Sequence, residues 1–186
     1  MILRGLFLLA QGKASGMREF DSSVDAFYAS IAPLIAFPLV VDGMSVVQGH
    51  WQTGILSFLG QLCAVLALPV MIQAFAQATG REARWLRTSV ALGWSFWIIL
   101  PAALIASFLS AGMVTAGMGE NTGALLALGL VAGYLLWYRW FILRTGLGLG
   151  RWQAAILIGV TSVAIGILTA GPALVDLAWY GRIVHY

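Results

Sequence analysis

Three side chains of this sequence have the chemistry of a proton or cation site: the carboxylates Asp42 and Asp176 and the imidazole His50. Asp42 lies about five residues from the end of an apolar run, which is roughly 7 Å at 1.5 Å per residue. A carboxylate deep in hydrocarbon costs on the order of 2.5–3.5 kcal/mol on insertion scales, so such residues are functional candidates. The three residues therefore predict either an ion site facing the far side of a membrane or polar groups at a wetted interface.

The stretch GLGLG, residues 146–150, could be a phosphate-binding loop, but it matches neither GxGxxG nor a Walker loop. It lacks the GK[ST] ending and follows no predicted strand. The sequence contains no HExxH motif, no paired carboxylates and no evident Ser, His and Asp on one face. With one cysteine, Cys63, and two histidines, it offers no metal-binding cluster. We therefore predict no catalytic, cofactor-binding or metal-binding residue, and a protein that is not an enzyme.

The elements that must position these residues follow from composition. The chain has 186 residues, of which 61% are hydrophobic and only 9% are charged. A soluble domain carries about 25% charged residues. A surface this poor in charge indicates that the natural solvent is lipid.

Five apolar stretches are each near or above the ~20 residues that cross a hydrocarbon core. They cover about residues 26–47, 53–77, 86–113, 123–143 and 153–171. The links are too short to hold a soluble domain, so we expect one all-α transmembrane domain over residues 1–186. Residues 1–19 predict a short interfacial amphipathic helix whose apolar face, with Leu3, Phe7 and Leu8, enters the headgroup region.

Nine of the ten basic residues fall on one side of this five-span arrangement. The positive-inside rule assigns that side to the cytoplasm, with the N-terminus inside and the C-terminus outside. The basic residues either only set this topology or also contact lipid headgroups or a partner protein, together with nearby tryptophans; nucleic acid is not expected. The candidate contacts are Lys13, Arg18, Arg81, Arg84, Arg87, Arg139, Arg144, Arg151, Trp137, Trp140 and Trp152.

Small and polar residues within the spans predict how the helices pack. Gly129 and Gly133 have the GxxxG spacing that lets another backbone approach closely. The polar residues lack a charge at the middle of the membrane, so interhelical hydrogen bonds are a better interpretation than a transport path. These polar residues are Gln61, Gln73, Ser95, Ser107, Thr161 and Ser162. The glycines of GLGLG predict the end of the fourth helix and a turn toward the fifth.

Short motifs along most of the chain resemble a group of small alphaproteobacterial inner-membrane proteins that are similar to the Yip-like five-span superfamily. The motifs are Phe20-Asp21, Trp94, and the block from Trp140-Phe141 to Arg144-Thr145. The pattern often has an acid where this chain has Arg139, and an Asn where it has Gly93. The resemblance implies a five-helix bundle in the bacterial cytoplasmic membrane and no established activity, cofactor or catalytic residue.

Three functions remain open on these observations. The leading hypothesis is a non-catalytic accessory subunit of a larger inner-membrane complex, for example a respiratory or photosynthetic assembly, because many aromatic side chains at membrane depth could contact other integral membrane subunits. The alternative is a small transporter or channel subunit that uses Asp42, His50 and Asp176. A second alternative is a lipid-binding or membrane-shaping protein that uses the basic side.

Overall fold

The computed structural model describes the backbone of residues 2–183 and the side chains of residues 2–170. All the regular elements of the described chain are helices, and five helical segments are long and apolar enough to cross a membrane. The protein is therefore an all-α, multi-pass membrane protein, as the sequence predicts. Its elements in order are α1 (Ile2–Ala10), η1 (Ala14–Glu19), α2 (Val24–Val47), α3 (Trp51–Ala78), η2 (Glu82–Arg84), α4 (Trp85–Ser95), η3 (Phe96–Ile98), α5 (Ile99–Thr115), α6 (Glu120–Leu147) and α7 (Arg151–Ile183).

Most helix boundaries fall within a few residues of the predicted spans, and the main difference lies in the third span. There the 3-10 turn η3 separates α4 from α5. Pro101 has no N–H to donate to the carbonyl of Trp97, and the chain tightens into η3 just before it. The last helix, α7, also continues beyond residue 171 to Ile183.

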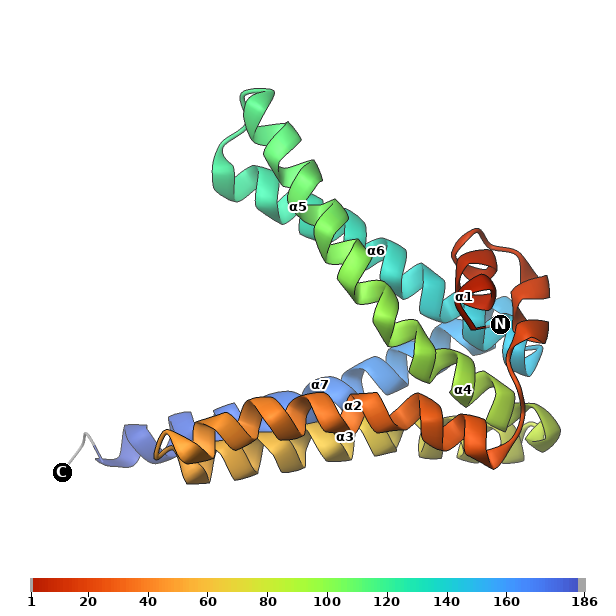
Figure 1. Ribbon diagram of the computed structural model, residues 1–186, viewed down its shortest axis with the longest axis horizontal. Coiled ribbons are helices and arrows are strands. Elements are labelled where there is room, and N and C mark those ends of the chain that lie inside the picture. Colours follow the sequence, from red (N-terminus) through yellow and green to blue (C-terminus); the bar gives the residue numbers. More distant parts are fainter. Residues whose placement is uncertain (1, 184–186) are drawn as a thin grey trace.

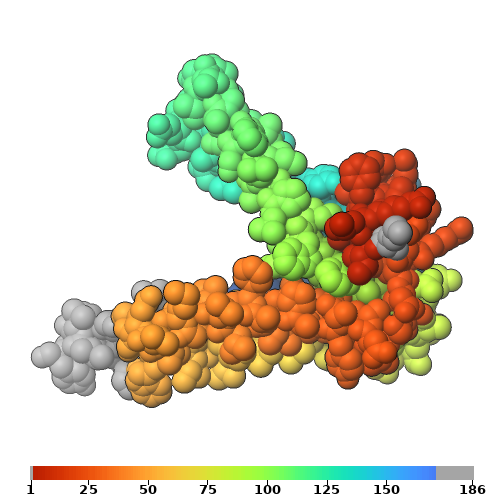
Figure 2. Space-filling view, in the orientation of Figure 1, coloured from red at the N-terminus to blue at the C-terminus, as the bar shows by residue number. Residues whose placement is uncertain are grey.

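The helices form two arms that diverge from a common end (Figure 1). One arm consists of α2, α3 and α7, and the other is the hairpin of α5 and α6, which packs on the first arm only near its base. Helices α1 and α4 lie where the arms meet. We call this common end the basic end, and the opening between α2 and α5 the wedge. The space-filling view shows that side chains leave the wedge open (Figure 2).

The hydrophobic core lies at the basic end. Leu9, Ile72, Ile142 and Leu147 are fully buried there, from α1, α3 and α6. Gly146 of α6 permits the close approach of α4, because an added Cβ would lie 2.5 Å from Thr88 Oγ1. Away from this end, the spans pack little against one another. In α2, for example, only 6% of the hydrophobic window is buried.

Helix α1 is attached to α6 by two tyrosines one turn apart. Tyr134 Oη donates to the carbonyl of Ala10 at 2.8 Å, and Tyr138 Oη donates to the carbonyl of Leu6 at 3.3 Å. Leu6 is buried, whereas Leu3 and Phe7 are 81% and 66% exposed. The helix thus has one face docked on the protein and one apolar face free to meet lipid.

The GLGLG stretch forms the turn from α6 to α7, as predicted. Gly148 adopts φ 64°, in the left-handed region, and the N–H of Leu149 donates to the carbonyl of Arg144 at 2.9 Å. This is a typical way to end a helix. Helix α7 then begins at Arg151, and Gln153 Oε1 accepts from the N–H of Gly150 at 3.1 Å. The backbone N–H groups at this turn are used by the fold itself.

The hairpin of α5 and α6 packs through small residues other than the predicted GxxxG pair. Ala106 and Ala127 are buried, and an added Cβ on Gly123 would contact Met113 of α5 at 3.4 Å. Gly129 and Gly133 have open space where a side chain would be. A role for these two glycines in contact with another chain stays a prediction.

Candidate functional site

The carboxylate of Asp42 lies inside the α2–α3 hairpin, where the sequence indicates one end of the first span. Asp42 is only 7% exposed, and Gln61 Nε2 donates to its Oδ2 at 3.2 Å. The same amide group donates to Ser57 Oγ at 3.1 Å. Gln61 is ten residues from the start of α3, about 15 Å along the helix axis. The Gln61 side chain leans back toward the α2–α3 turn, where it meets Ser57 and Asp42.

The other two residues of the predicted ion site do not join Asp42. His50 is the residue before α3, and among the described side chains it has no hydrogen-bond or ion-pair partner. The side chain of Asp176 lies outside the described residues. Within residues 2–170 no three His, Cys, Asp or Glu side chains are grouped as a metal site. Asp42, Gln61 and Ser57 can hold a proton or part of a cation's coordination shell, but the structure shows no complete path.

The hydroxyls in the spans bond mainly to their own helices rather than across helices. Ser95 donates to the carbonyl of Leu92, and Thr161 donates to that of Leu157. The predicted interhelical hydrogen bond is thus confirmed for Gln61, whereas the hydroxyls of Ser95 and Thr161 bond to carbonyls of their own helices. A hydroxyl one turn from a backbone carbonyl commonly does so.

Three arginines line a cavity of about 490 Å³ at the basic end. Arg18 comes from η1, Arg84 is the last residue of η2, and Arg87 lies in the first turn of α4. We call this the arginine cavity. Its lining contains no acidic residue and is completed by Ala14, Met17, Ala83, Thr145 and Gly146. In the described part of the chain, none of the three guanidinium groups has a hydrogen-bond or ion-pair partner.

Local structure explains why these arginines gather. Arg84 and Arg87 are three residues apart around the first turn of α4, and this spacing places them on one side of the helix. The close contact between Gly146 and Thr88 brings the end of α6 beside that turn. The N-terminus of a helix carries partial positive charge, so the arginines add to the helix dipole instead of compensating it. The site is electropositive from both sources.

Asp21 is a nearby acid whose pKa is lowered mainly by hydrogen bonds and slightly by the charge of Arg87. It accepts hydrogen bonds from Ser23 Oγ at 2.8 Å and from the N–H of Ser22 at 2.7 Å. These bonds, with a smaller contribution from the charge of Arg87, hold the pKa of Asp21 below its usual value of 3.8. Asp21 is fully exposed and does not line the arginine cavity.

The remaining predicted contact residues are dispersed over the basic end. Arg81 donates to Gln153 Oε1 at 3.4 Å, and Arg144 stacks over Trp140, with its guanidinium carbon 5.3 Å from the ring centre. Trp140 Nε1 donates to the carbonyl of Arg151 at 3.2 Å. Lys13 is exposed, Trp137 stacks on Phe141 at 5.7 Å between ring centres, and Trp152 is 84% exposed.

Arg139 differs from the other described basic residues because it lies farther from the end of its span than they do. It is eight residues before the end of α6, about 12 Å along the axis, and it is half-buried. No described residue forms a hydrogen bond or ion pair with it. Unpaired charges at membrane depth are costly, so this guanidinium is a candidate for contact with another molecule.

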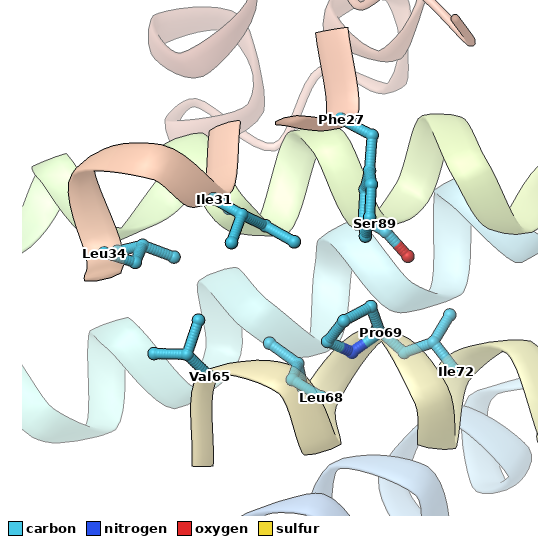
Figure 3. Close-up of a pocket in the computed structure, with 9 residues that line it drawn as sticks. Phe27, Ile31, Leu34, Val65, Leu68, Pro69, Ile72 and Ser89 are labelled. Atoms are coloured by element: carbon cyan, nitrogen blue, oxygen red, sulfur yellow. The ribbon is translucent and has the colours of Figure 1, made fainter. Parts of the chain in front are cut away.

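A second, much smaller cavity of about 20 Å³ lies between α2, α3 and α4 (Figure 3). Phe27, Ile31, Val65 and Pro69 are among its apolar lining residues, and the hydroxyl of Ser89 is its polar group. That hydroxyl is buried without a hydrogen-bond partner in the described chain. A space of this volume holds about one water molecule, so it cannot be a substrate pocket.

The fold defines the class of this protein as a multi-pass, all-helical membrane protein. No family model, curated protein or solved structure matches the chain. The resemblance to five-span Yip-like proteins therefore stays a prediction.

Sequence reasoning missed Gln61 as the partner of Asp42, and it missed the two tyrosines that hold α1. The four-residue spacing of Tyr134 and Tyr138 was the available signal, because residues four apart share a helix face. Nothing in the sequence indicates which element that face contacts.

Proposed function

We propose that the protein is a non-catalytic accessory subunit of a larger assembly in the bacterial cytoplasmic membrane. In this proposal the basic end lies in the cytoplasm, and the wedge receives a membrane-spanning helix of a partner subunit. The observation that carries the proposal is Arg139, an unpaired guanidinium within α6. A partner helix with an acidic residue at matching depth would neutralise it.

The apolar surfaces of both arms support this interpretation. Leu104 and Phe108 of α5 are 60% and 72% exposed, and Leu39 and Val40 of α2 are also exposed. Phe37 of α2 and Trp97 meet edge to face, with ring centres 6.3 Å apart, where the arms converge. A helix packed between the arms would gain van der Waals contact along two walls, which drives association where both lipid and protein are apolar.

The energetic argument rests on the depth and direction of Arg139. A charged side chain at the bilayer centre costs about 2.5–3.5 kcal/mol on insertion scales, and less toward the interface. Side chains on a helix lean toward its N-terminus, which for α6 is the direction away from the basic end. Snorkelling to the nearer surface therefore works against this lean, and an ion pair with a partner is the better solution.

Purification in mild detergent tests the proposal through Arg139. We expect native membranes to yield this chain with a partner subunit, and Arg139→Gln to reduce the retained partner at least about tenfold, or ~1.4 kcal/mol. Arg139→Lys keeps the charge and should retain much more of it. Arg144→Gln, which changes an arginine at the end of the same helix, is the matched control.

A photo-crosslinking amino acid at Phe108 gives a second readout. It should link the partner in intact membranes, and the link should weaken in the Arg139→Gln background. The proposal fails if the wild-type protein runs only as an isolated monomer. It also fails if Arg139→Gln and Arg144→Gln retain the partner equally while both remain folded.

Ion transport is the second candidate function, and the buried Asp42 favours it. A carboxylate bonded to the amide of Gln61 can exchange a proton or cation with a path that this chain forms with others. Asp42→Asn preserves the hydrogen-bond acceptor but removes the charge, so it should abolish flux in proteoliposomes while leaving folding intact. Flux that is unchanged, or absent for every candidate ion in the wild type, would argue against transport.

A further inference from the structure

We infer that the arginine cavity binds a phosphate group, supplied either by a phospholipid headgroup or by free phosphate. This site goes beyond the accessory-subunit proposal and does not depend on it, because it lies at the basic end, outside the wedge. Its three cationic ligands would be Arg18, Arg84 and Arg87.

The charge distribution selects an anion. Three arginines line one cavity that has no acid in its lining, and none of their guanidinium groups has a hydrogen-bond or ion-pair partner among the described residues. Their mutual repulsion and the positive end of α4 both favour a negative ligand. Arginine presents a planar fork of N–H donors that matches phosphate oxygens in pairs, so a tetrahedral oxyanion satisfies several donors at once.

The volume of the cavity indicates more than a simple ion. About 490 Å³ falls within the ~300–1,000 Å³ of typical small-molecule sites. The apolar parts of the lining, Ala14, Met17 and Ala83, could contact the carbon skeleton attached to a phosphate. A phosphate ester would use both parts of the cavity, whereas inorganic phosphate would use only the arginines.

The neighbouring elements place the cavity at the membrane surface. Arg18 belongs to η1, which follows α1 directly and packs against it through Gly16 and Leu9. The free face of α1 presents Leu3 and Phe7, the kind of apolar face that enters the headgroup region. A lipid phosphate beside this face would lie at the level of the arginines.

Two binding measurements on the full chain in phosphate-free maltoside test the inference. The first is the thermal unfolding midpoint with 0–20 mM inorganic phosphate against sodium chloride of equal ionic strength. The second is native mass spectrometry of lipids retained from micelles containing phosphatidylglycerol or phosphatidylcholine. For the wild type we expect either a phosphate-specific rise in the midpoint or preferential retention of phosphatidylglycerol.

Variants assign the effect to the cavity. Arg84→Gln and the double change Arg18→Gln with Arg87→Gln should weaken binding at least about tenfold, because each removes charged hydrogen-bond donors. Arg151→Gln, an exposed arginine at the same end, should bind like the wild type. Circular dichroism and the midpoint without ligand confirm that each variant is folded.

Each outcome decides the matter. Retention of phosphatidylglycerol that inorganic phosphate displaces identifies a phospholipid headgroup, and a phosphate-specific shift without lipid preference identifies free phosphate. The inference is overturned if the wild type shows neither effect. Equal binding by Arg84→Gln, the double variant and Arg151→Gln overturns it as well, because the arginines would then contribute only general charge.

Discussion

Gln61 Nε2 lies 3.2 Å from Asp42 Oδ2, and this contact joins α2 to α3 at the level of the membrane. Asp42 is 7% exposed, so water does not replace a lost donor easily. A buried acceptor without a donor is costly, and more so when it is charged. The hydrogen bond therefore stabilises the hairpin and, in the transport hypothesis, sets the position of the only charge in α2 beyond its first turn.

Removal of the amide should destabilise the protein because Asp42 then loses its donor. We expect Gln61→Leu to lower the free energy of unfolding by ~1–2 kcal/mol, a range that allows for the modest value of many hydrogen bonds in membranes. Ser57→Ala, which leaves the Gln61–Asp42 bond in place, should cost less than ~0.5 kcal/mol. Unfolding midpoints in detergent would contradict the expectation if both variants lost the same stability.

Glycine positions give a prediction with a matched control. Gly146→Ala places a Cβ 2.5 Å from Thr88 Oγ1 and 2.8 Å from its Cγ2, so α6 and α4 must separate. We expect a loss of ~1–3 kcal/mol, as for overpacked cores. Gly129→Ala enters open space and should be neutral or slightly stabilising, since alanine favours the helix.

Suppression by a second change tests the cause. Thr88→Ala removes the two nearest atoms that the new methyl group would meet and leaves only the flexible end of Met17, at 3.0 Å. Gly146→Ala with Thr88→Ala should therefore unfold at a midpoint close to that of the wild type. The hydroxyl of Thr88 donates only to the carbonyl of Arg84, within its own helix. If the double variant is as unstable as Gly146→Ala alone, the close approach of α6 to α4 is not the reason.

The spans and the turn at residues 146–150 could be predicted from sequence because lipid imposes strong local rules. A run of apolar residues long enough to cross the membrane must be helical, and glycine after Leu147 ends the helix wherever it packs. Composition and length alone therefore indicate five helices. These signals need no knowledge of tertiary contacts.

The wedge and the docking of α1 could not be predicted in this way. In lipid, a residue such as Phe108 is equally suitable against an acyl chain or another helix, so the apolar pattern does not reveal the packed face. The arginine cavity likewise depends on bringing Arg18 beside Arg84 and Arg87, which are far from it in sequence. The positive-inside rule places all three on one side but does not group them.

The loss of folding stability at low pH should depend on Asp21. Hydrogen bonds from Ser23 and Ser22 lower its pKa in the folded state below 3.8. A lowered folded pKa means that this contribution is complete above the unfolded value and is lost as pH falls through the folded value. Because Ser23 also caps α2 by accepting from the N–H of Ala26, protonation of Asp21 should loosen the start of that helix.

Unfolding midpoints between pH 6 and pH 2.5 would measure this effect. Wild-type protein should lose more stability below about pH 4 than Asp21→Asn, which cannot titrate at this position. Ser23→Ala removes the largest cause of the lowered pKa. Like Asp21→Asn, it should lose less stability than the wild type as pH falls. Parallel curves for wild type and Asp21→Asn would show that the Ser23 bond does not couple proton binding to folding.

Ser89 should be one of the few polar residues whose removal does not harm the protein. Its hydroxyl is buried beside Pro69 without a described partner, and an unpaired buried hydroxyl is destabilising (Figure 3). We expect Ser89→Ala to be neutral or to raise stability by up to ~1 kcal/mol. Ser95→Ala, the control in the same helix, loses a 2.6 Å hydrogen bond to the carbonyl of Leu92 and should be less stable.

A loss of more than ~1 kcal/mol in Ser89→Ala would instead mean that a water fills the cavity and bonds this hydroxyl, since the space admits one. The carbonyl of Val65 would be a suitable second ligand for that water, because Pro69 has no N–H to donate to it.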